Sequence, residues 1–377
     1  MTVEVDRVLI VGGGIAGSSL ALLLAGQGRE VQIIEQQPVW GAMGTGITLM
    51  GPALRAFEAL GVLDQCLQSG CGFTSMTLYS AAGEYLEEVR LHQLLGPESP
   101  AIAGMMRPEL HRILAGAALE AGAKIRTSTS VSSLYQHGDQ VEVELTDGSR
   151  ESYGLVIGAD GIHSKVRSLL LGEQAPSPEF LGQWVWRAVV DRPDAAIGES
   201  QFYGTEGKAG FTPISATQMY VFLVENNQIT QQLATDERPA RMRELMAPFG
   251  GILAELRETI TDPANVDARA LHSLMLDRPW HRGRVMLIGD AAHATTPHLG
   301  MGGAIALEDS LVLAELLDSG DDLATVLEAF LERRFERCRM VVENSAQLAA
   351  WEGDAIDHSE EAAALQNESF AALALPI

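Results

Sequence analysis

The first forty residues of the chain contain the pattern that most constrains its fold. An apolar, β-branched run over 8–11 ends in a G-x-G-x-x-G sequence whose glycines are Gly12, Gly14 and Gly17. An apolar helical segment follows, and a second apolar run ends at Glu35. This order of strand, glycine turn, helix, strand and acid is typical of a βαβ unit that binds a dinucleotide. The N-terminus of its helix attracts the pyrophosphate, because its N–H groups are unpaired and carry positive charge.

The three glycines and the acid of this pattern have separate physical tasks. Gly12 allows the sharp turn, Gly14 lets the backbone approach a phosphate, and Gly17 permits close packing of helix on strand. Glu35 is placed to accept hydrogen bonds from an adenosine ribose, which favours an unphosphorylated ribose and disfavours NADP as resident ligand. A glycine turn without a ligand is the alternative. Since strand, helix and terminal acid are all present, the pattern favours an ADP-containing cofactor, either FAD or NAD.

Composition limits the class of protein. The 377 residues allow roughly two or three domains, and 46% hydrophobic with 20% charged residues is typical of globular proteins. A formal net charge of −24 disfavours nucleic acid or an anionic membrane as a partner. No apolar run reaches the roughly 20 residues that cross a bilayer, and no basic leader precedes the first strand. We therefore expect a cytoplasmic protein, as a monomer or homodimer.

The cysteines and histidines do not have the spacing of metal ligands. Cys66, Cys71 and Cys338 are isolated from one another, and His293 and His298 lack cysteine or carboxylate companions at ligand spacing. We expect reduced cysteines that pack in the interior, and no metal site.

Two later apolar runs repeat the pattern of a strand that ends in glycine and acid. The run over 155–158 is followed by Asp160, and the run over 285–288 is followed by Gly289 and Asp290. In open α/β sheets, ligands bind at the carboxyl ends of the strands. For Asp160 an Asx-type turn is the alternative reading. A glycine-rich stretch over 300–303 then opens a helix predicted over 304–317. One extended dinucleotide explains these strand ends better than several separate sites.

The middle of the chain has a different character. Residues from about 176 to 267 carry strand-like runs with scattered proline, glycine and aromatic residues, which predicts an antiparallel sheet. A β-hairpin is expected over 73–90, and helices over 241–246 and 252–260. The segment 323–349 is amphipathic, and the tail over 352–377 is acidic and alanine-rich, with uncertain order.

Together these motifs resemble the single-component FAD-dependent aromatic hydroxylases, that is, the p-hydroxybenzoate and salicylate hydroxylase-like flavoprotein monooxygenases. The likeness is most specific in 12–35, in Gly-Ala-Asp-Gly-Ile-His-Ser-Lys-Val-Arg over 158–167, and in 289–309. It implies an α/β fold, with a Rossmann-like FAD-binding domain, an interleaved antiparallel β-sheet substrate domain and C-terminal helices. The expected FAD-binding domain is discontinuous and comprises 1–72, 100–175 and 268–320. The substrate domain would comprise 73–99 and 176–267, and the helical region 321–377.

The resemblance also assigns contacts to FAD. The first glycines would hold the pyrophosphate and Glu35 the ribose, while Thr48 would lie along the cofactor. Arg107, which precedes Pro108 at a helix start, would reach the FAD; a surface arginine is the alternative. Asp290 would bond the ribityl chain, and the backbone of 300–303 the flavin ring. The full implied set is Gly12, Gly14, Ile15, Ala16, Gly17, Glu35, Gln36, Gly46, Thr48, Arg107, Val131, Asp160, Asp290, Pro297, Gly300, Gly302 and Gly303.

The reaction implied by the resemblance is the hydroxylation of a small aromatic substrate by O2. NADH or NADPH would reduce the FAD as a transient co-substrate, and a flavin C4a-hydroperoxide would transfer its hydroxyl group. The substrate would be phenolic, salicylate-like or N-heteroaromatic. Epoxidation, Baeyer–Villiger insertion and oxidative ring opening or decarboxylation remain open. So do an NAD-dependent dehydrogenase and a flavin-binding protein without turnover.

The substrate side is expected to be an apolar chamber that excludes water. We expect Trp184 in it, His298 and Pro297 at its roof, and the substrate-binding set Trp186, Arg187, Phe211, Pro213, Phe222 and Met301. Arg187 could bind a substrate carboxylate, but a surface arginine at a strand end is the favoured alternative for it. His298 is a candidate catalytic residue, although a histidine bonded to backbone is an equal alternative. Tyr203 is a second candidate, with Tyr220 as its rival and sheet packing as the alternative for both. The family's usual glutamine and asparagine after Gly300 are absent, and Thr212-Pro213 replaces its Tyr-Pro pair.

Overall fold

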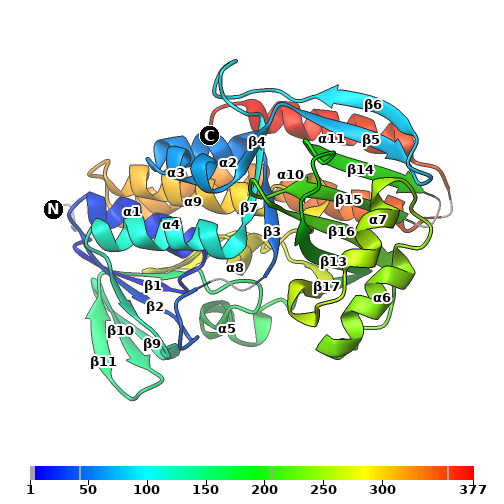
Figure 1. The fold of residues 1–377 in the computed structure, drawn as a ribbon. Helices are drawn as coiled ribbons and strands as arrows, with labels where there is room; N and C mark the ends of the chain where they lie inside the picture. Colours follow the sequence, from blue (N-terminus) through cyan, green and yellow to red (C-terminus); the bar gives the residue numbers. More distant parts are fainter. Residues whose placement is uncertain (1–4, 42–43, 205–206, 355) are drawn as a thin grey trace.

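The computed structural model describes residues 5–41, 44–204, 207–354 and 356–377. Ala42 and Met43, in the glycine-rich loop after Trp40, lie outside the described residues. Figure 1 shows a parallel sheet with its helices on one side of the molecule and a second large sheet on the other. Among the described residues, no helix combines the length and the apolar character needed to span a membrane.

The amino-terminal motif forms the centre of a parallel sheet, as predicted. β1 (Arg7–Val11) pairs in parallel with β2 (Glu30–Ile34) and with β12 (Leu155–Gly158), and β12 pairs with β19 (Val285–Leu287). The edges are β8 (Lys124–Arg126), parallel to β2, and β18 (His281–Arg282), which pairs antiparallel with β19. The central strands are almost entirely buried because helices or further strands cover both faces. The carboxyl ends of β1, β12 and β19 are therefore neighbours.

Helices pack around this sheet. α1 (Ile15–Gly26) contacts both α4 (Arg107–Glu120) and α9 (Gly302–Leu317) on the same side of the sheet (Figure 1). α9 begins two residues earlier than predicted, so its first turn includes Gly302 and Gly303. The shorter helices are α2 (Gly51–Ala59), α3 (Leu63–Ser69), α5 (Lys165–Leu171) and α8 (Asp290–His293).

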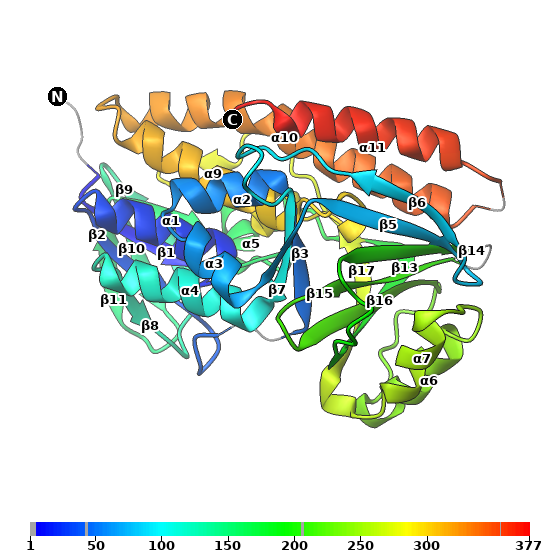
Figure 2. The ribbon, with the colours of Figure 1, turned by 45° about the horizontal axis from the view of Figure 1, so that its top comes forward.

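The C-terminal region is helical throughout most of its length. α10 (Leu323–Glu352) and α11 (Ser359–Ala374) run side by side, as Figure 2 shows. The sequence left it uncertain whether the tail over 352–377 is ordered, and Arg337 on α10 is one of the residues that hold it. The Arg337 guanidinium donates hydrogen bonds to the carbonyl oxygens of Ala372 and Leu373 at the end of α11.

The second sheet has seven strands in the order β17-β13-β16-β15-β14-β5-β6. The predicted hairpin is confirmed as β5 and β6, and it joins the sheet beside β14. The pairs within this sheet are antiparallel, as predicted, except at this junction, where β14 and β5 pair in parallel. The strands are β5 (Ser75–Ser80), β6 (Tyr85–Arg90), β13 (Glu179–Asp191), β14 (Glu199–Gly204), β15 (Gly207–Pro213), β16 (Gln218–Asn226) and β17 (Val266–Ser273).

Two short helices cover one face of this sheet. α6 (Arg238–Leu245) and α7 (Ile252–Thr259) pack there around a second hydrophobic core, separate from the main core around the parallel sheet. Both helices lie close to their predicted positions. We call the opposite face, which faces α10 and the parallel-sheet half, the inner face (Figure 2).

Two small sheets complete the fold. β3 (Gly46–Leu49), β7 (Ile102–Met106) and β4 (Cys71–Phe73) form a bridge between the two halves, whereas β9 (Val131–His137), β10 (Gln140–Leu145) and β11 (Arg150–Tyr153) flank the parallel sheet. β8 and β9 are consecutive in the chain but are separate strands in different sheets. The break between them falls around Ser128, whose φ of 52° is incompatible with a continuous strand.

Candidate active site

The glycine turn after β1 touches the end of β12. Gly12 has a φ of +101°, and a Cβ atom on it would lie 2.4 Å from the carbonyl oxygen of Ala159 and 2.8 Å from the Cα atom of Asp160. Any side chain there would collide with backbone, which cannot move aside easily. Only glycine fits, so two motifs that are far apart in the sequence meet at this point.

The third motif lies at the same place. A Cβ atom on Gly289 would lie 3.1 Å from that of Ala16 and 3.5 Å from that of Ala306. One on Gly303 would lie 3.7 Å from Cδ1 of Ile47 and 3.9 Å from that of Ile15. The first turns of α1 and α9 therefore converge with the start of β3 and the end of β19.

The first turns of α1 and α9 have free donors. Neither helix has a side-chain N-cap hydrogen bond or an acidic residue in its first turn, so the early N–H groups remain available to an anion. The position of a Cβ atom on Gly14 is open, with no atom within 4 Å. Two ring nitrogens contact the turn as well: Trp40 Nε1 donates to the carbonyl oxygen of Gly13 at 2.9 Å, and His111 Nε2 lies 2.8 Å from the same oxygen. No local pattern in the sequence indicates these two contacts.

Asp290 and Arg107 border the space in front of these helices. The side chain of Asp290 is accessible although protein surrounds it closely, which is the condition of a residue that lines a deep cleft. Burial raises its pKa, while His293 and Arg107 act in the opposite direction. Burial, together with the charges of Arg187 and Arg269, lowers the pKa of Arg107 to about 10. Free helix N-termini, glycines and charged groups along one cleft fit an elongated dinucleotide with a pyrophosphate.

Two of the predicted cofactor acids are engaged with the protein itself. The Asp160 carboxylate accepts hydrogen bonds from Ser164 Oγ at 2.5 Å and from the N–H groups of Lys165 and Val166 at 2.7 and 3.0 Å. Asp160 thus satisfies the first N–H groups of α5, five and six residues further along the chain, which differs from the bond to the second following residue that defines an Asx turn. The Glu35 carboxylate accepts from the Gly13 N–H at 3.1 Å, which ties the end of β2 to the glycine turn.

Other predicted cofactor residues lie in different settings. Thr48 Oγ1 is hydrogen-bonded to Tyr220 Oη at 2.6 Å and to Thr212 Oγ1 at 3.1 Å, so it links β3 to the second sheet. Gly46 is required beside it, because a Cβ atom there would lie 2.1 Å from the Tyr220 ring. Val131, at the start of β9, is buried in the main core, so its side chain does not reach the cleft. Gln36 is exposed after β2, and Pro297 is exposed in the turn before α9.

The predicted apolar chamber needs correction, because strand alternation divides its members between two faces. Trp184 and Trp186 on β13 and Phe211 on β15 belong to the core beneath α6 and α7, together with Met242 and Leu253. Successive side chains of a strand point to opposite faces, so these aromatic residues point away from the inner face. Pro213 has the same parity as Phe211 and is buried. Met301 is buried in the main core.

The remaining two predicted substrate residues are brought together. Arg187 on β13 pairs directly with Phe222 on β16, and both side chains are partly accessible on the inner face. Tyr220 is two residues away on β16, with its ring centroid 6.0 Å from that of Phe222. Burial lowers the pKa of Arg187, although the nearby Tyr220 opposes this effect. The inner face thus offers a cation beside aromatic rings.

The two candidate catalytic residues lie at the border of this face. His298 is buried, with Nδ1 hydrogen-bonded to Thr296 Oγ1 at 2.9 Å and Nε2 at 3.3 Å from Oε2 of Glu352. Tyr203 is more accessible, and its hydroxyl donates to Oε1 of Gln201 at 2.7 Å. Tyr203 is therefore at the open end of the inner face, whereas its rival Tyr220 is deep beside Thr48.

Charged residues that the sequence reasoning missed also occupy the inner face. Glu199 on β14 is buried, and Lys208 on β15 places its Nζ atom 3.5 Å from Oε1 of Glu352. The available signal was the spacing of polar residues: Glu199, Gln201 and Tyr203 alternate along one strand. That spacing assigns them to one face but does not reveal that the face lines a site.

A buried ion cluster lies directly behind Asp290. His293 Nε2 donates to Oδ2 of Asp309 at 2.6 Å, and Arg334 Nε donates to Oδ1 at 2.9 Å. In the described part of the chain, His293, Asp309 and Cys338 are the group that brings three potential metal-ligand atoms together. Arg334 occupies the space beside the carboxylate, and both oxygens of Asp309 accept hydrogen bonds. The arrangement is that of a structural hydrogen-bond network.

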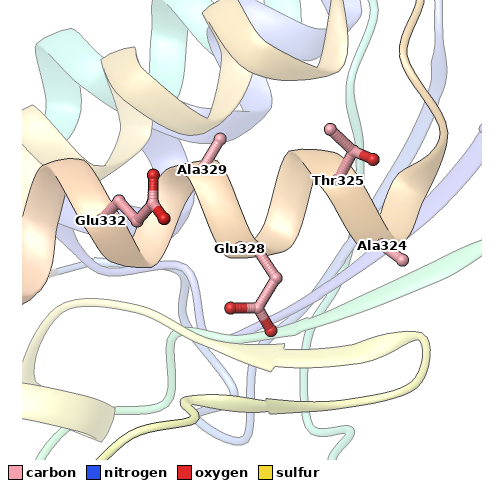
Figure 3. Close-up of a pocket in the computed structure, with 5 residues that line it drawn as sticks. All are labelled: Ala324, Thr325, Glu328, Ala329 and Glu332. Carbon is pink, nitrogen blue, oxygen red and sulfur yellow. The ribbon is translucent and has the colours of Figure 1, made fainter.

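The surface hollow on α10 is not part of this site. Figure 3 shows its five lining residues, which are small or acidic and do not converge on a common point. Glu352 marks the end of α10 that lies beside His298 and Lys208. The lining residue closest to it along the helix, Glu332, precedes it by twenty positions, which corresponds to about 30 Å. The hollow is lined by Ala324, Thr325, Glu328, Ala329 and Glu332.

Comparison with known proteins agrees with this geometry. Residues 6–345 match the family model described as FAD binding domain. The chain is 33% identical over 353 residues to 2-heptyl-3-hydroxy-4(1H)-quinolone synthase of Pseudomonas aeruginosa, with 92% of this chain and 90% of that protein covered. It is 31% identical over 357 residues to the aurachin C monooxygenase/isomerase of Stigmatella aurantiaca, with 92% and 90% covered.

Solved structures show the same fold. PqsL of P. aeruginosa in complex with 2-aminobenzoylacetate superposes with a TM-score of 0.82 and 25% identity, covering 97% of this chain and 100% of that one. Klebsiella pneumoniae HpxO complexed with FAD and uric acid gives a TM-score of 0.84 at 24% identity, covering 97% of each chain. The predicted fold class and FAD as cofactor are confirmed. Because residues 6–345 match the family model and both relatives align over 92% of this chain, the chain belongs to the FAD-dependent monooxygenase family.

Proposed function

We propose that this enzyme hydroxylates a small phenolic or N-heteroaromatic ring at the inner face, with NADH or NADPH as co-substrate. The observation that carries the proposal is the pairing of Arg187 with Phe222 on the accessible inner face, beside the cleft bordered by Asp290. An aromatic face binds a flat ring, and a neighbouring guanidinium binds a carboxylate or a ring oxygen. The relative that makes a quinolone supports the inclusion of N-heteroaromatic substrates.

The protein would hold FAD along the converging strand ends. The free N-termini of α1 and α9 would receive the pyrophosphate and the flavin's polar edge, and Asp290 would accept hydrogen bonds from the hydroxyl-bearing chain between them. When bound, FAD accepts two electrons from NAD(P)H and activates O2, so that one oxygen atom enters the ring and the other leaves as water.

The chain's own residues would bind and orient the substrate. Arg187 would fix an acidic substituent, and Phe222 and Tyr220 would stack against the ring or pack at its edge. The bridge of β3 and β7 closes the deep end of the inner face through the bonds between Thr48 and Tyr220. A closed end of this kind limits the access of water, which would otherwise divert the activated oxygen into peroxide.

The test is a substrate screen with the purified, FAD-loaded enzyme. Salicylate, simple phenols, hydroxypyridines and 4-hydroxyquinoline would each be added while NADH and NADPH consumption, oxygen uptake and product mass are followed. We expect at least one compound to stimulate NAD(P)H consumption and to gain 16 mass units, the mass of one oxygen atom. A protein that fails to take up FAD, or that consumes NAD(P)H without any hydroxylated product, would contradict the proposal.

A further inference from the structure

A row of polar side chains crosses the inner face at its closed end. Thr212 on β15 pairs directly with Tyr220 on β16. Ser200 on β14 pairs with Phe211, so the antiparallel register continues to Glu199 opposite Thr212. Glu199, Thr212 and Tyr220 therefore lie side by side. Tyr220 and Thr212 are both hydrogen-bonded to Thr48, which fixes this end of the row.

The carboxylate of Glu199 is buried and only half satisfied. The residue is 6% exposed, and its Oε1 atom accepts one hydrogen bond of 3.3 Å from Nε2 of Gln201. Among the described residues, its Oε2 atom has no hydrogen-bond partner. A buried carboxylate oxygen without a donor is costly, and such groups in a protein interior are frequently retained for function.

The charged groups that face Glu199 leave it without a strong partner. The positive charge of Lys208 on β15 acts on Glu199, but the Lys208 Nζ atom is paired with Glu352 of α10 at 3.5 Å. Glu352 also lies 3.3 Å from His298 in the turn before α9. Tyr220 on β16 is the other titratable group beside Glu199. Burial raises the pKa of Glu199 to about 7, although Gln201 and Lys208 act to lower it.

We propose that Glu199 accepts the ring hydroxyl or ring N–H proton of the substrate, an inference that rests on the proposed function. The O–H or N–H bond of the substrate breaks, the proton goes to Oε2 of Glu199, and the electron pair stays on the heteroatom. Delocalisation of that pair makes the neighbouring ring carbons more nucleophilic towards the incoming oxygen. A base whose pKa lies near neutrality is best suited to such a transfer.

The other inner-face candidates are poorer acceptors. Burial raises the pKa of Tyr220, so its hydroxyl stays protonated. The Tyr220 hydroxyl is also already hydrogen-bonded to Thr48 Oγ1. His298 has Nδ1 engaged with Thr296 and faces Glu352 through Nε2. Glu199 combines a free acceptor atom with a place in the row that ends at Tyr220.

The first test compares Glu199→Gln with wild type and with Glu120→Gln, a control on the exposed end of α4. With the best substrate from the screen, kcat/KM of the wild type and of the control should rise with pH through about 7. Glu199→Gln should lose this limb, with a kcat/KM about 10²- to 10⁴-fold lower at pH 8. FAD content and thermal unfolding serve as folding checks. An unchanged pH profile in Glu199→Gln would overturn the inference.

The second test measures proton sharing directly, with 4-nitrophenol as the probe. Its ionised form absorbs at longer wavelength, so a spectral titration gives the pKa of the bound probe. Removing a nearby negative charge stabilises the phenolate, and the bound probe should therefore have a lower pKa in Glu199→Gln than in the wild type. Equal values would contradict the inference, as would a probe that does not bind.

The two proposals fail in different ways. A wild-type enzyme that binds FAD but shows no aromatic-stimulated hydroxylation refutes the proposed function. A wild-type enzyme that hydroxylates, together with a Glu199→Gln variant of equal rate and equal pH profile, refutes only the role of Glu199.

Discussion

The carboxylate of Asp309 accepts a 2.9 Å hydrogen bond from the backbone N–H of Gly289, the residue that precedes Asp290. The same oxygen, Oδ2, accepts from His293, while Arg334 binds the other oxygen. α9 and α10 are thereby connected to the turn that carries Asp290. The position of a cleft residue thus depends on a buried ion cluster behind it.

Asp309→Asn should destabilise the protein strongly. The substitution leaves the Arg334 guanidinium, which is fully buried, without its carboxylate partner on this side. Breaking one partner of a buried ion pair typically costs about 3–5 kcal/mol. Urea unfolding would measure the loss, with Asp139→Asn in the exposed β9–β10 turn as the control. A loss below about 1 kcal/mol would show that the cluster contributes little.

The stabilising effect of the His293–Asp309 pair should depend on pH in a defined window. Burial opposes the charge of Asp309, but His293 and Arg334 outweigh it and hold its pKa at about 2, so its contribution is lost as the pH falls from about 4 towards 2. Burial also opposes the charge of His293, but Cys338 and Asp309 raise its pKa well above normal. That contribution is complete below about pH 6.5 and declines as the pH rises towards the folded-state pKa.

The difference in unfolding free energy between wild type and Asp309→Asn should therefore be largest between about pH 4 and 6.5. Urea titrations across that range and on either side of it would measure the difference. A difference that does not vary from pH 3 to pH 9 would argue against a charged pair.

Gly12→Ala should abolish FAD binding. The new Cβ atom would lie 2.4 Å from a backbone oxygen, and a φ of +101° is strained for alanine. The turn must open to relieve the clash, which moves the N-terminus of α1 away from the pyrophosphate. Flavin absorbance per protein would show the loss, with Gly28→Ala as the matched control because that glycine also has positive φ but open space around it. Normal flavin content in Gly12→Ala would contradict the proposed cradle.

Arg187→Met should weaken the binding of an acidic aromatic substrate and leave FAD binding intact. Loss of a hydrogen bond to a charged group costs about 1.5–3 kcal/mol, which corresponds to a roughly 10- to 100-fold higher KM. Steady-state kinetics with the best substrate from the screen would show it. Arg282→Met, at the exposed sheet edge, is the control. Equal KM values in the two variants would place the substrate elsewhere.

Phe211→Leu should affect stability and not substrate binding, because its side chain belongs to the core beneath α6 and α7. Replacement of one large apolar side chain by a smaller one in such a core should cost about 1 kcal/mol or somewhat more. Thermal unfolding and KM would be measured on the same preparation. A large increase in KM with unchanged stability would return Phe211 to the substrate site.

Much of the fold was predictable because the signals are local. The run over 8–11 and Gly12 identify a strand and a turn within a few residues, and the same logic applies at Gly289. Hairpin and helix signals placed β5, β6, α6 and α7 correctly to within a few residues. The inner face was less predictable: Trp186 and Arg187 are adjacent in sequence, and nothing local indicates which of them lies on that face.

The sequence by itself determined the cofactor class, since the glycine turns, the helix starts and the acids at strand ends are properties of short segments. Only the tertiary structure decided which strand face lines the site, which acids are consumed as caps, as Asp160 is, and which remain free, as Glu199 is on one oxygen. The physical reason is that burial, register and charge pairing depend on elements far apart in the chain. Lys208 and Glu352 lie 3.5 Å apart in space, and no pattern within either segment encodes that contact.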